Sequence, residues 1–487
     1  MEWFKAHASH AFRIELMHLS VLLVLPVLLA QSLRSPDGLY LDPDIWWHLA
    51  NARYLFSTHH FIRTEPYAYT VAGQSWANPE WLAEVPFWLA HAHFGALGLY
   101  LLTLLLVFTN VALVYLRSRE QASPEAAFWA SSSAVLLFTV NTGPRTILCA
   151  YILLSLLCWA IERFEAMRSK VICWVPLIFL IWTNTHGSWL IGIFLLAVYL
   201  ICGWFTVQRG SIVPSRRSQT DQMRLCWILL GSVAVLFLNP YGWRLVWNPF
   251  DMMFQQKLNI ATIEEWRPLD LGTFVGKDVA LIIVMMLAAA VLKGREWKLY
   301  ELLWVCFAWY AAFAHMRFAF LAGVIVTPYL ARDLSALVPA RSSHREWPLL
   351  NAAFALGCLC LLLRFTPSRE RAQQAELQSF PDTLIRLQQP GWRLLNQYEL
   401  GGRLAYRGHK DFVDSRVDIF EHQGVFADYL DVLNVKRPLE VLDKYKIDHI
   451  LFEQATPFVY VLEHAGGWHI VQREAKWVLL ERSGQKK

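Results

Sequence analysis

An acidic pair directly follows the first apolar stretch of the chain. Asp42 and Asp44 flank Pro43, and His48 follows in the run Ile45-Trp46-Trp47-His48-Leu49. Two carboxylates this close need a cation, a metal ion or a shared proton, and either one could act as a general base. We therefore expect Asp42, Asp44 and His48 to form a catalytic group, in which the two aspartates are candidate ligands of Mg²⁺ or Mn²⁺.

The two aspartates are expected to have different duties. A residue before proline is restricted to extended geometry, which leaves Asp42 without a local structural role. Asp44 follows the proline, where an aspartate is a good N-cap for a helix that begins at Ile45. The sequence thus favours Asp42 as the base and Asp44 as a helix cap that also contacts a metal ion or substrate.

Further ionisable side chains occur at the ends of apolar stretches, on the same predicted side of the membrane. The stretches themselves carry almost none, whereas an ion-coupled transporter needs them at mid-membrane depth. Acids, bases and arginines at one depth suit chemistry on an anionic, lipid-anchored substrate. The residues expected to bind substrate are Glu80, Arg145, His186, Glu264, His315 and Arg317.

Structural alternatives exist for several of these residues. Arg145 follows Gly143-Pro144 and could extend to lipid headgroups. His186 could cap a helix end, and His315 and Arg317 could anchor a helix at the membrane interface. Three other charged residues, Asp37, Arg244 and Glu265, are expected to be solvated loop charges.

The elements that must position these residues are membrane helices. Only 17% of the 487 residues are charged, against about 25% in soluble proteins. Residues 365–487 hold 34 of the 83 charged residues, so residues 1–364 are too poor in charge to coat a water-facing surface. The basic residues lie in short loops rather than on one face, so nucleic acid is not an expected partner.

Apolar stretches in residues 1–364 predict about 11 transmembrane helices, which leaves long outer loops at 34–80 and 239–277. The first stretch is expected to be a retained anchor, because Pro36-Asp37-Gly38 does not fit a signal-peptidase site. The stretches are 17–33, 94–116, 125–141, 145–161, 171–185, 188–206, 225–239, 278–292, 299–314, 318–331 and 348–364.

Lysine and arginine favour one set of short loops, which predicts a cytoplasmic N-terminus. An odd number of crossings then places residues 365–487 outside, in the periplasm of a bacterium. This part is expected to be a small soluble α/β domain. Helical spacing occurs at 372–388 and 436–446, and strand patterns occur at Ile447–Phe452, Trp468–Gln472 and Trp477–Glu481.

Several motifs together resemble a bacterial family of multi-spanning GT-C-type glycosyltransferase-like proteins. The resemblance begins with Asp42-Pro43-Asp44-Ile45-Trp46-Trp47-His48-Leu49 and covers most of the chain. Glu65, Ala68 and Ser415 depart from the family pattern. The other matching segments are Thr64-Glu65-Pro66, Trp76–Leu82, Asn184-x-His186-Gly187, Asn239-Pro240-Tyr241-Gly242, Glu265-Trp266-Arg267-Pro268, Arg317, Asn396-x-Tyr398-x-x-Gly401-Gly402 and Phe412-Val413-Asp414-x-Arg416.

The resemblance implies an inverting hexosyl- or pentosyltransferase of the bacterial inner membrane. Its partners would be membrane lipids, a polyprenyl-phosphate-linked sugar donor and a periplasmic acceptor, either a lipid or a cell-envelope glycan. Asp42 or Asp44 would be the base or the metal-site acid. Two alternatives stay open: a non-catalytic scaffold or assembly protein, and a transporter of lipid-linked glycans.

Overall fold

The computed structural model describes residues 16–27, 42–138, 143–293, 296–337 and 348–484. Asp37 and the Pro36-Asp37-Gly38 segment lie outside these ranges. A helix is found within each of the eleven predicted apolar stretches. They are Leu16–Val27, α4 (Ala96–Arg119), α5 (Pro124–Phe138), α6 (Ile147–Met167), α7 (Val175–Thr183), α8 (Trp189–Cys202), α9 (Gln219–Val235), α12 (Phe274–Lys293), α13 (Leu299–Ala314), α14 (Ala319–Leu337) and α15 (Pro348–Phe365).

Not all of these helices are long enough to cross a membrane unaided. Within the described ranges, four helical segments are both long and apolar enough: α4, α6, Phe274–Leu292 and Met316–Leu337. A fifth is obtained if α15 and α16 (Arg369–Ser379), bent by 48° at their junction, count as one span. The chain is therefore a helical membrane protein, and the count of 11 crossings stays a prediction.

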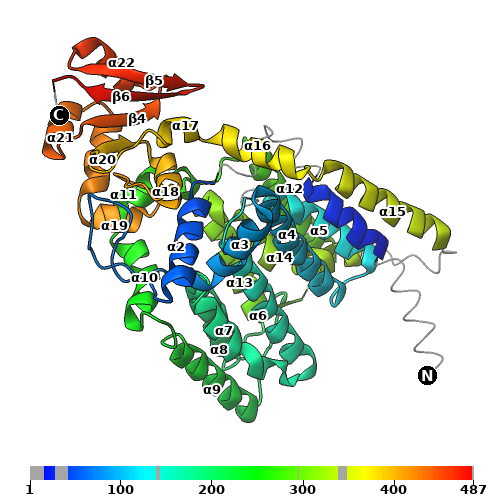
Figure 1. The fold of residues 1–487 in the computed structure, drawn as a ribbon. Coiled ribbons are helices and arrows are strands. Elements are labelled where there is room, and N and C mark those ends of the chain that lie inside the picture. The colour runs from blue at the N-terminus through cyan, green and yellow to red at the C-terminus, as the bar shows by residue number, and fades with distance from the viewer. Residues whose placement is uncertain (1–15, 28–41, 139–142, 294–295, 338–347, 485–487) are drawn as a thin grey trace.

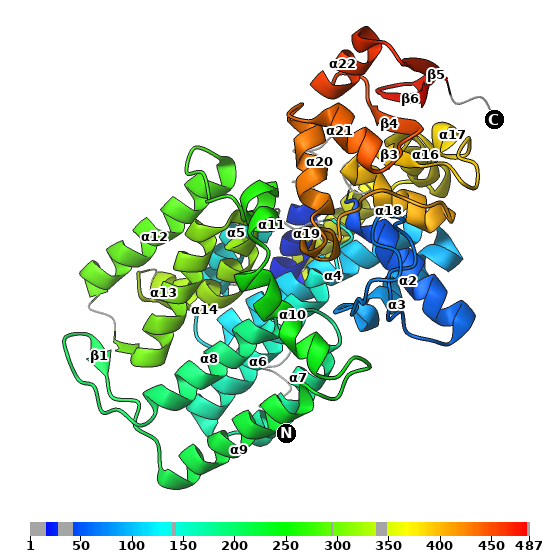
Figure 2. The same ribbon diagram turned by 90° about the vertical axis from the view of Figure 1, so that its left-hand side faces the viewer.

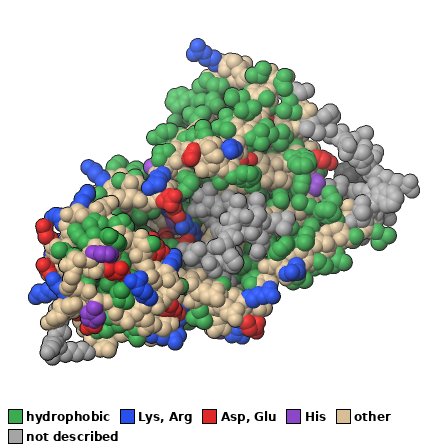
Figure 3. Space-filling view, turned by 90° about the horizontal axis from the view of Figure 1, so that it is seen from above, with side chains coloured by type: hydrophobic (Ala, Val, Ile, Leu, Met, Phe, Trp, Pro, Cys, Tyr) green, Lys and Arg blue, Asp and Glu red, His purple; other side chains and the backbone are tan. Residues whose placement is uncertain are grey.

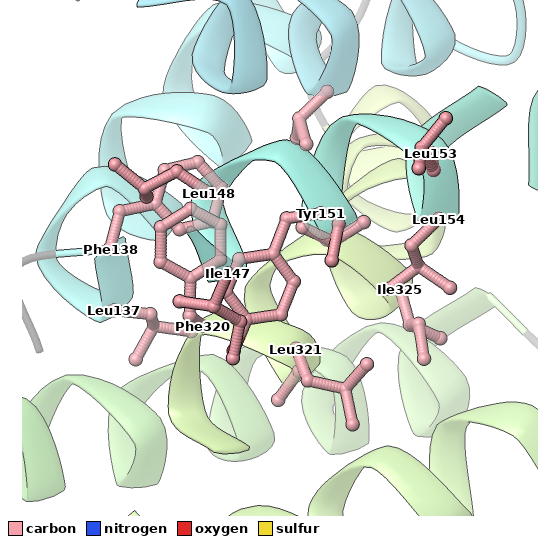
Figure 4. Close-up of a cluster of buried hydrophobic side chains, with 14 of the residues drawn as sticks. Leu137, Phe138, Ile147, Leu148, Tyr151, Leu153, Leu154, Phe320, Leu321 and Ile325 are labelled. Atoms are coloured by element: carbon pink, nitrogen blue, oxygen red, sulfur yellow. The ribbon is translucent and has the colours of Figure 1, made fainter. Parts of the chain in front are cut away.

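Large apolar side chains pack the middle of the helix bundle (Figure 4). The ring of Phe320 on α14 stacks between Phe138 of α5 and Tyr151 of α6, at centroid distances of 4.2 and 4.1 Å. Gly323, one turn further along α14, allows this approach, because a Cβ there would lie 2.7 Å from the Phe138 ring. Aromatic stacking thus holds the end of α5 and the beginnings of α6 and α14 together.

The two long loops contain short helices of their own. The first loop forms α2 (Asp44–Thr58), and α3 (Trp81–Phe94) follows it. The second loop forms α10 (Trp243–Phe254), α11 (Lys257–Thr262) and the 3-10 turn η3 (Glu264–Trp266). Two other 3-10 turns, η2 (Lys170–Trp174) and η4 (Met316–Phe318), precede α7 and α14. The short strands β1 (Ile212–Val213) and β2 (Trp297–Lys298) pair in parallel.

The C-terminal part contains a four-stranded sheet with order β3-β4-β6-β5 (Figures 1 and 2). The β3–β4 pair is parallel and the other two pairs are antiparallel. The strands are β3 (Leu394–Asn396), β4 (His449–Glu453), β5 (Trp468–Glu474) and β6 (Trp477–Arg482). The helices are α16, α17 (Asp382–Ile385), α18 (Tyr398–Arg407), α19 (Val417–His422), α20 (Val425–Leu433), α21 (Pro438–Lys444) and α22 (Pro457–Ala465).

The first loop and the C-terminal part share one hydrophobic core. Trp47, Ile62 and Trp76 from the loop pack in the same cluster as Phe412 and Phe420. In Figures 1 and 2, α2 lies between α18 and α3. Figure 3 shows charged and His side chains gathered over the left-hand part, where the C-terminal sheet and helices lie. The shared core therefore ties the predicted catalytic loop to the C-terminal part.

Candidate active site

The start of α2 is held by Asp42 rather than by Asp44. The Oδ1 atom of Asp42 accepts a hydrogen bond of 3.1 Å from the backbone N–H of Asp44. Pro43 occupies the N-cap position, and Asp44 is the first helical residue. The prediction that Asp44 caps this helix was therefore wrong, because the Asp42 side chain bonds two residues ahead, in the manner of an Asx turn.

Arg145 links the first loop to the second. Its Nε atom pairs with the other carboxylate oxygen of Asp42, and its terminal nitrogen pairs with Glu265. Gly143 permits this arrangement, since a Cβ there would lie 3.3 Å from Asp42 Oδ2. Arg145 thus faces two carboxylates. Glu265 is part of the site and not the solvated charge that was predicted, whereas Glu264, predicted to bind substrate, is exposed.

Asp44 is the more accessible of the two aspartates. Its side chain is half-buried, whereas Asp42 is only 7% exposed. Burial and the neighbouring charge of Asp42 raise the pKa of Asp44 to about 7, although Arg145 and a hydrogen bond with Ser415 oppose the shift. A carboxyl group with a pKa near neutrality is suited to general-base work.

Ser415 comes from the C-terminal part of the chain, so two distant segments meet at Asp44. Its hydroxyl also accepts a hydrogen bond of 3.1 Å from the Trp47 ring nitrogen. On the same side, α18 approaches α2 through Gly402, where a Cβ would lie 2.7 Å from the Pro43 carbonyl oxygen. The C-terminal part therefore fixes the position of the Asp44 backbone.

His48 lies one helical turn after Asp44 and is held between two glutamates. Its Nδ1 atom is 3.0 Å from Glu84 Oε1, and its Nε2 atom is 3.3 Å from Glu80 Oε2. Burial alone would lower the pKa of His48, but the hydrogen bond with Glu84 and the nearby carboxylates, including Asp44, raise it. With both ring nitrogens facing carboxylates, His48 is suited to carry a positive charge.

Glu84 is a site residue that sequence reasoning missed. It is buried in α3 and also accepts hydrogen bonds from Asn51 (3.0 Å) and Asn78 (2.7 Å). One signal was available, because a lone glutamate in the otherwise apolar run Trp81–Phe94 needs polar partners when it is buried. Glu84 orients His48 rather than facing a ligand itself.

His186 lies on the other side of Glu80. Its Nε2 atom is 3.4 Å from Glu80 Oε1, and its Nδ1 atom accepts a hydrogen bond of 3.0 Å from the backbone N–H of Ser188. The proton of the neutral ring is therefore on Nε2. Burial lowers the pKa of His186, and the charge of Arg317 lowers it further while Glu80 opposes the shift. His186 is thus a neutral hydrogen-bond donor in this site.

The segment before α14 carries Arg317 and His315. The Arg317 guanidinium lies 4.3 Å from the ring centroid of Trp266, which directly follows Glu265. The ring of His315 bonds to the Trp266 carbonyl oxygen, and the N–H of Met316 donates to Arg267. His315 therefore holds the second loop against the start of α14.

Most of the predicted residues meet in one chain of contacts and short-range charge interactions. The charge of Arg317 affects His186, and Glu80 lies between His186 and His48. Asp44 interacts electrostatically with His48 and with Asp42, and Asp42 pairs with Arg145. Glu264 and His315 lie outside this chain. The residues that the structure brings together are Asp42, Asp44, His48, Glu80, Arg145, His186, Glu265 and Arg317.

In this structure, protein groups hold the carboxylate oxygens of Asp42. Both oxygens of Asp42 are engaged, one by Arg145 and one by the N–H of Asp44. Among the described residues, no group of three or more His, Cys, Asp or Glu side chains could hold a metal ion. The Arg145 guanidinium is thus a cation already paired with Asp42, and a metal ion at the two aspartates stays a prediction.

Comparison with solved structures identifies the fold that carries this site. No protein-family model matches the sequence, and no curated protein is significantly similar to it. One solved structure that matches is the archaeal oligosaccharyltransferase AglB from Archaeoglobus fulgidus, in complex with an inhibitory peptide and a dolichol-phosphate. The TM-score is 0.60 at 14% identity, over 90% of this chain and 69% of AglB.

A second match is ArnT from Cupriavidus metallidurans, bound to undecaprenyl phosphate. The TM-score is 0.54 at 13% identity, over 96% of this chain and 98% of ArnT. AglB and ArnT are both GT-C-type glycosyltransferases. This chain has the GT-C fold. The resemblance to GT-C proteins that the sequence motifs indicated is therefore confirmed at the level of the fold.

Proposed function

We propose that this GT-C protein is a membrane glycosyltransferase that moves a sugar from a polyprenyl-phosphate carrier to an acceptor on the outer face, either a lipid or a cell-envelope glycan. The observation that carries the proposal is the half-buried Asp44, with a pKa raised to about 7 beside the Asp42–Arg145 pair. The fold adds support, because structures with this fold hold dolichol-phosphate and undecaprenyl phosphate.

Asp44 is assigned as the base, in place of Asp42. An acceptor hydroxyl attacks the anomeric carbon of the donor, and Asp44 takes the hydroxyl proton. The bond from that carbon to the phosphate oxygen breaks, and its electron pair leaves with the polyprenyl phosphate. A single displacement of this kind inverts the anomeric centre. Asp42 holds the loop and Arg145 in position, because both its oxygens are already engaged.

The leaving phosphate needs positive or hydrogen-bonding partners. Arg145 already pairs with two carboxylates, Asp42 and Glu265. We assign the phosphate to Arg317, whose charge acts on His186 and whose planar guanidinium can hold two oxygens at once, and to the Nε2–H of His186. The position of Arg317 over the Trp266 ring orients the guanidinium group.

The site is assigned to the outer face of the bacterial inner membrane. Support comes from the Lys/Arg bias of the loops, which favours a cytoplasmic N-terminus. In this orientation the first loop and the C-terminal part, which share one hydrophobic core, are both periplasmic. A non-catalytic scaffold is the second candidate, because the same shared core would also serve a protein that only binds partners.

Binding of undecaprenyl phosphate to the purified protein in lipid nanodiscs tests the proposal. We expect Arg317→Ala to weaken binding about tenfold or more, the size of a lost charge-assisted hydrogen-bond pair. Arg224→Ala, an exposed arginine of α9, is the matched control and should bind as the parent does. Equal binding by all three proteins would contradict the phosphate assignment. Absence of sugar transfer from any undecaprenyl-phosphate donor would favour the scaffold.

A further inference from the structure

A cavity of about 320 Å³ lies between the first loop, α10 and α19. It is separate from the Asp44 site and was not predicted from the sequence. Its volume falls at the lower end of the range of about 300–1,000 Å³ that small-molecule pockets span. Six of its lining residues carry the argument: Trp76, Arg244, Trp247, Asn248, Asp251 and Asp418.

The polar groups of this cavity are held in place by one another. The Arg244 guanidinium donates to Ser75 at 2.6 Å, and the Trp76 ring nitrogen donates to Asp418 at 3.3 Å. Asp251 Oδ2 lies 2.8 Å from the ring of His422 on α19. The cavity walls are thus fixed before a ligand arrives, and pre-organisation of this kind lowers the cost of binding.

The lining favours a neutral, hydroxyl-rich ligand. The half-exposed Trp247 indole offers a flat apolar face, Trp76 forms part of the wall, and amide, carboxylate and guanidinium groups supply donors and acceptors. A sugar ring has the same two properties, because its C–H bonds form a flat apolar face and its hydroxyls both donate and accept. Asp251 and Asp418 face Arg244 and His422 in the same lining, and this mixture of charges favours a neutral ligand over a phosphate.

The cavity adjoins the candidate active site on two sides. Trp76 forms one wall, and its ring centroid is 6.0 Å from that of Trp47, whose ring is 3.6 Å from that of His48. On the other side, a Cβ at Gly187, next to His186, would lie 3.7 Å from Asn248 Oδ1. A ligand in the cavity therefore lies beside the residues that face the donor.

We propose that this cavity binds a saccharide ring of the acceptor, with Trp247 and Trp76 against the ring and Asn248, Asp251 and Arg244 on its hydroxyls. The assignment rests on the proposed glycosyl transfer and names the acceptor class as a saccharide. That saccharide is either a free glycan or the sugar part of a glycolipid, since both present the same ring.

The test measures binding of three neutral trisaccharides, maltotriose, mannotriose and chitotriose, to the full-length protein in nanodiscs by saturation-transfer NMR and calorimetry. We expect at least one to bind, and Trp247→Ala to weaken its binding about tenfold, as truncation of a central tryptophan does. Trp247 is 49% exposed, so this change spares the core. Asn248→Ala should weaken the same trisaccharide by a smaller factor.

The matched control is Trp243→Ala, one turn earlier on α10, where Trp243 is 66% exposed and does not line the cavity. Unchanged saccharide binding by Trp243→Ala supports the proposal. Equal weakening by both tryptophan variants would assign α10 to the lipid interface and overturn it, as would absence of binding by all three trisaccharides.

Undecaprenyl phosphate binding, measured on the same samples, separates the two proposals. Saccharide binding without undecaprenyl phosphate binding would contradict the glycosyltransferase and leave the cavity standing. Tighter binding of a glycolipid that carries the recognised sugar than of the free trisaccharide identifies a lipid acceptor; equal affinity identifies a free glycan.

Discussion

At the scale of single residues, the two aspartates of the first loop predict different variant behaviour. Asp44→Asn should lower kcat about 10²–10⁴-fold with the protein still folded, because a general base contributes about that much. Asp42→Asn should instead lower both activity and thermal stability, because asparagine offers one acceptor oxygen where Asp42 uses two, and Arg145 loses its carboxylate partner. Sugar transfer and thermal unfolding of both proteins check this. A folded, inactive Asp42→Asn beside an active Asp44→Asn would reverse the assignment.

The pH dependence of transfer follows from the same carboxyl group. Burial and Asp42 raise the pKa of Asp44 from 3.8 to about 7. A protonated Asp44 cannot accept a proton, so kcat/KM should fall about tenfold per pH unit below about pH 7. An ordinary carboxyl group would keep its activity to about pH 5. A pH profile of kcat/KM that stays flat between pH 5.5 and 8 would contradict Asp44 as the base.

Thermal stability provides an independent measurement of that pKa. The folded protein binds the Asp44 proton more tightly than the unfolded chain does, so ionisation costs stability as pH rises from about 4 to about 7. Asp44→Asn removes this cost. Its melting temperature should exceed that of the parent at pH 8, and the gain should shrink as pH falls towards 4.

Residue types and positions at helix ends singled out several residues that the structure brings together. They are Asp42, Asp44, His48, Arg145 and His186, which lie near the ends of apolar stretches. The choice of Glu264 over Glu265 failed for a reason of local geometry: both lie in the turn η3, and only the backbone path decides which one faces Arg145. A single sequence does not contain that path.

At the scale of elements, close packing of α18 on α2 predicts a position that tolerates only glycine. Gly402→Ala would place a Cβ 2.7 Å from the Pro43 carbonyl oxygen and 3.3 Å from the Trp47 backbone nitrogen. The helices must then move apart at the residue preceding Asp44. We expect at least a tenfold loss of transfer, since shifts of about 1 Å in a catalytic group can cost about 10²-fold.

Gly357→Ala in α15 is the matched control for that experiment. It is also a helical glycine, but nothing lies within 4 Å of its added Cβ. Its activity should equal that of the parent. Similar losses in the two variants would mean that helix content, rather than the contact with α2, determines activity.

Long apolar helices were predictable from the sequence because their burial in lipid or in the bundle requires continuous apolar residues. Some short elements were not, although a helix start at Ile45 was predicted. β3 has only three residues, and α3 mixes tryptophans with buried polar residues such as Glu84. The buried polar residues in these elements form hydrogen bonds with partners that are distant in the sequence, so no local pattern of apolar residues predicts the elements.

At the scale of the whole molecule, orientation in the membrane is the first quantity to measure. We expect the N-terminus inside and residues 365–487 outside, because lysine and arginine are concentrated in the loops that lie on the same side of the membrane as the N-terminus. A reporter enzyme that works only in the periplasm, fused after Lys487, should be active. Activity of a second reporter that works only in the cytoplasm, fused at the same position, would place the first loop, the C-terminal part and their shared core inside and would contradict an outer-face site.

The contact between the first loop and the C-terminal part was not predictable from composition. The content of charged residues instead divides the chain into residues 1–364 and 365–487. The structure pairs the motif Thr64-Glu65-Pro66 with the motif that ends at Arg416 through a buried ion pair. Both motifs were visible in the sequence, but not that they bind each other. Glu65, Ala68 and Ser415, where the family pattern changes, all lie at this junction.

The buried Arg416 predicts how strongly this junction supports the site. Its guanidinium bonds to Glu65 at 2.6 Å and 3.1 Å and to Asp414, and its side chain is 1% exposed. Arg416→Ala would leave two carboxylates buried without a cation, a change that typically costs about 3–5 kcal/mol. We expect faster amide hydrogen exchange in residues 62–76 and 410–420, together with a loss of transfer, although no group facing the substrate is altered.

Arg437→Ala is the control, because Arg437 also pairs with an aspartate of this part of the chain but is 55% exposed. This variant should leave hydrogen exchange and sugar transfer unchanged. Normal transfer by an Arg416→Ala protein with fast exchange at this junction would show that Asp44 does not depend on the C-terminal part for its position.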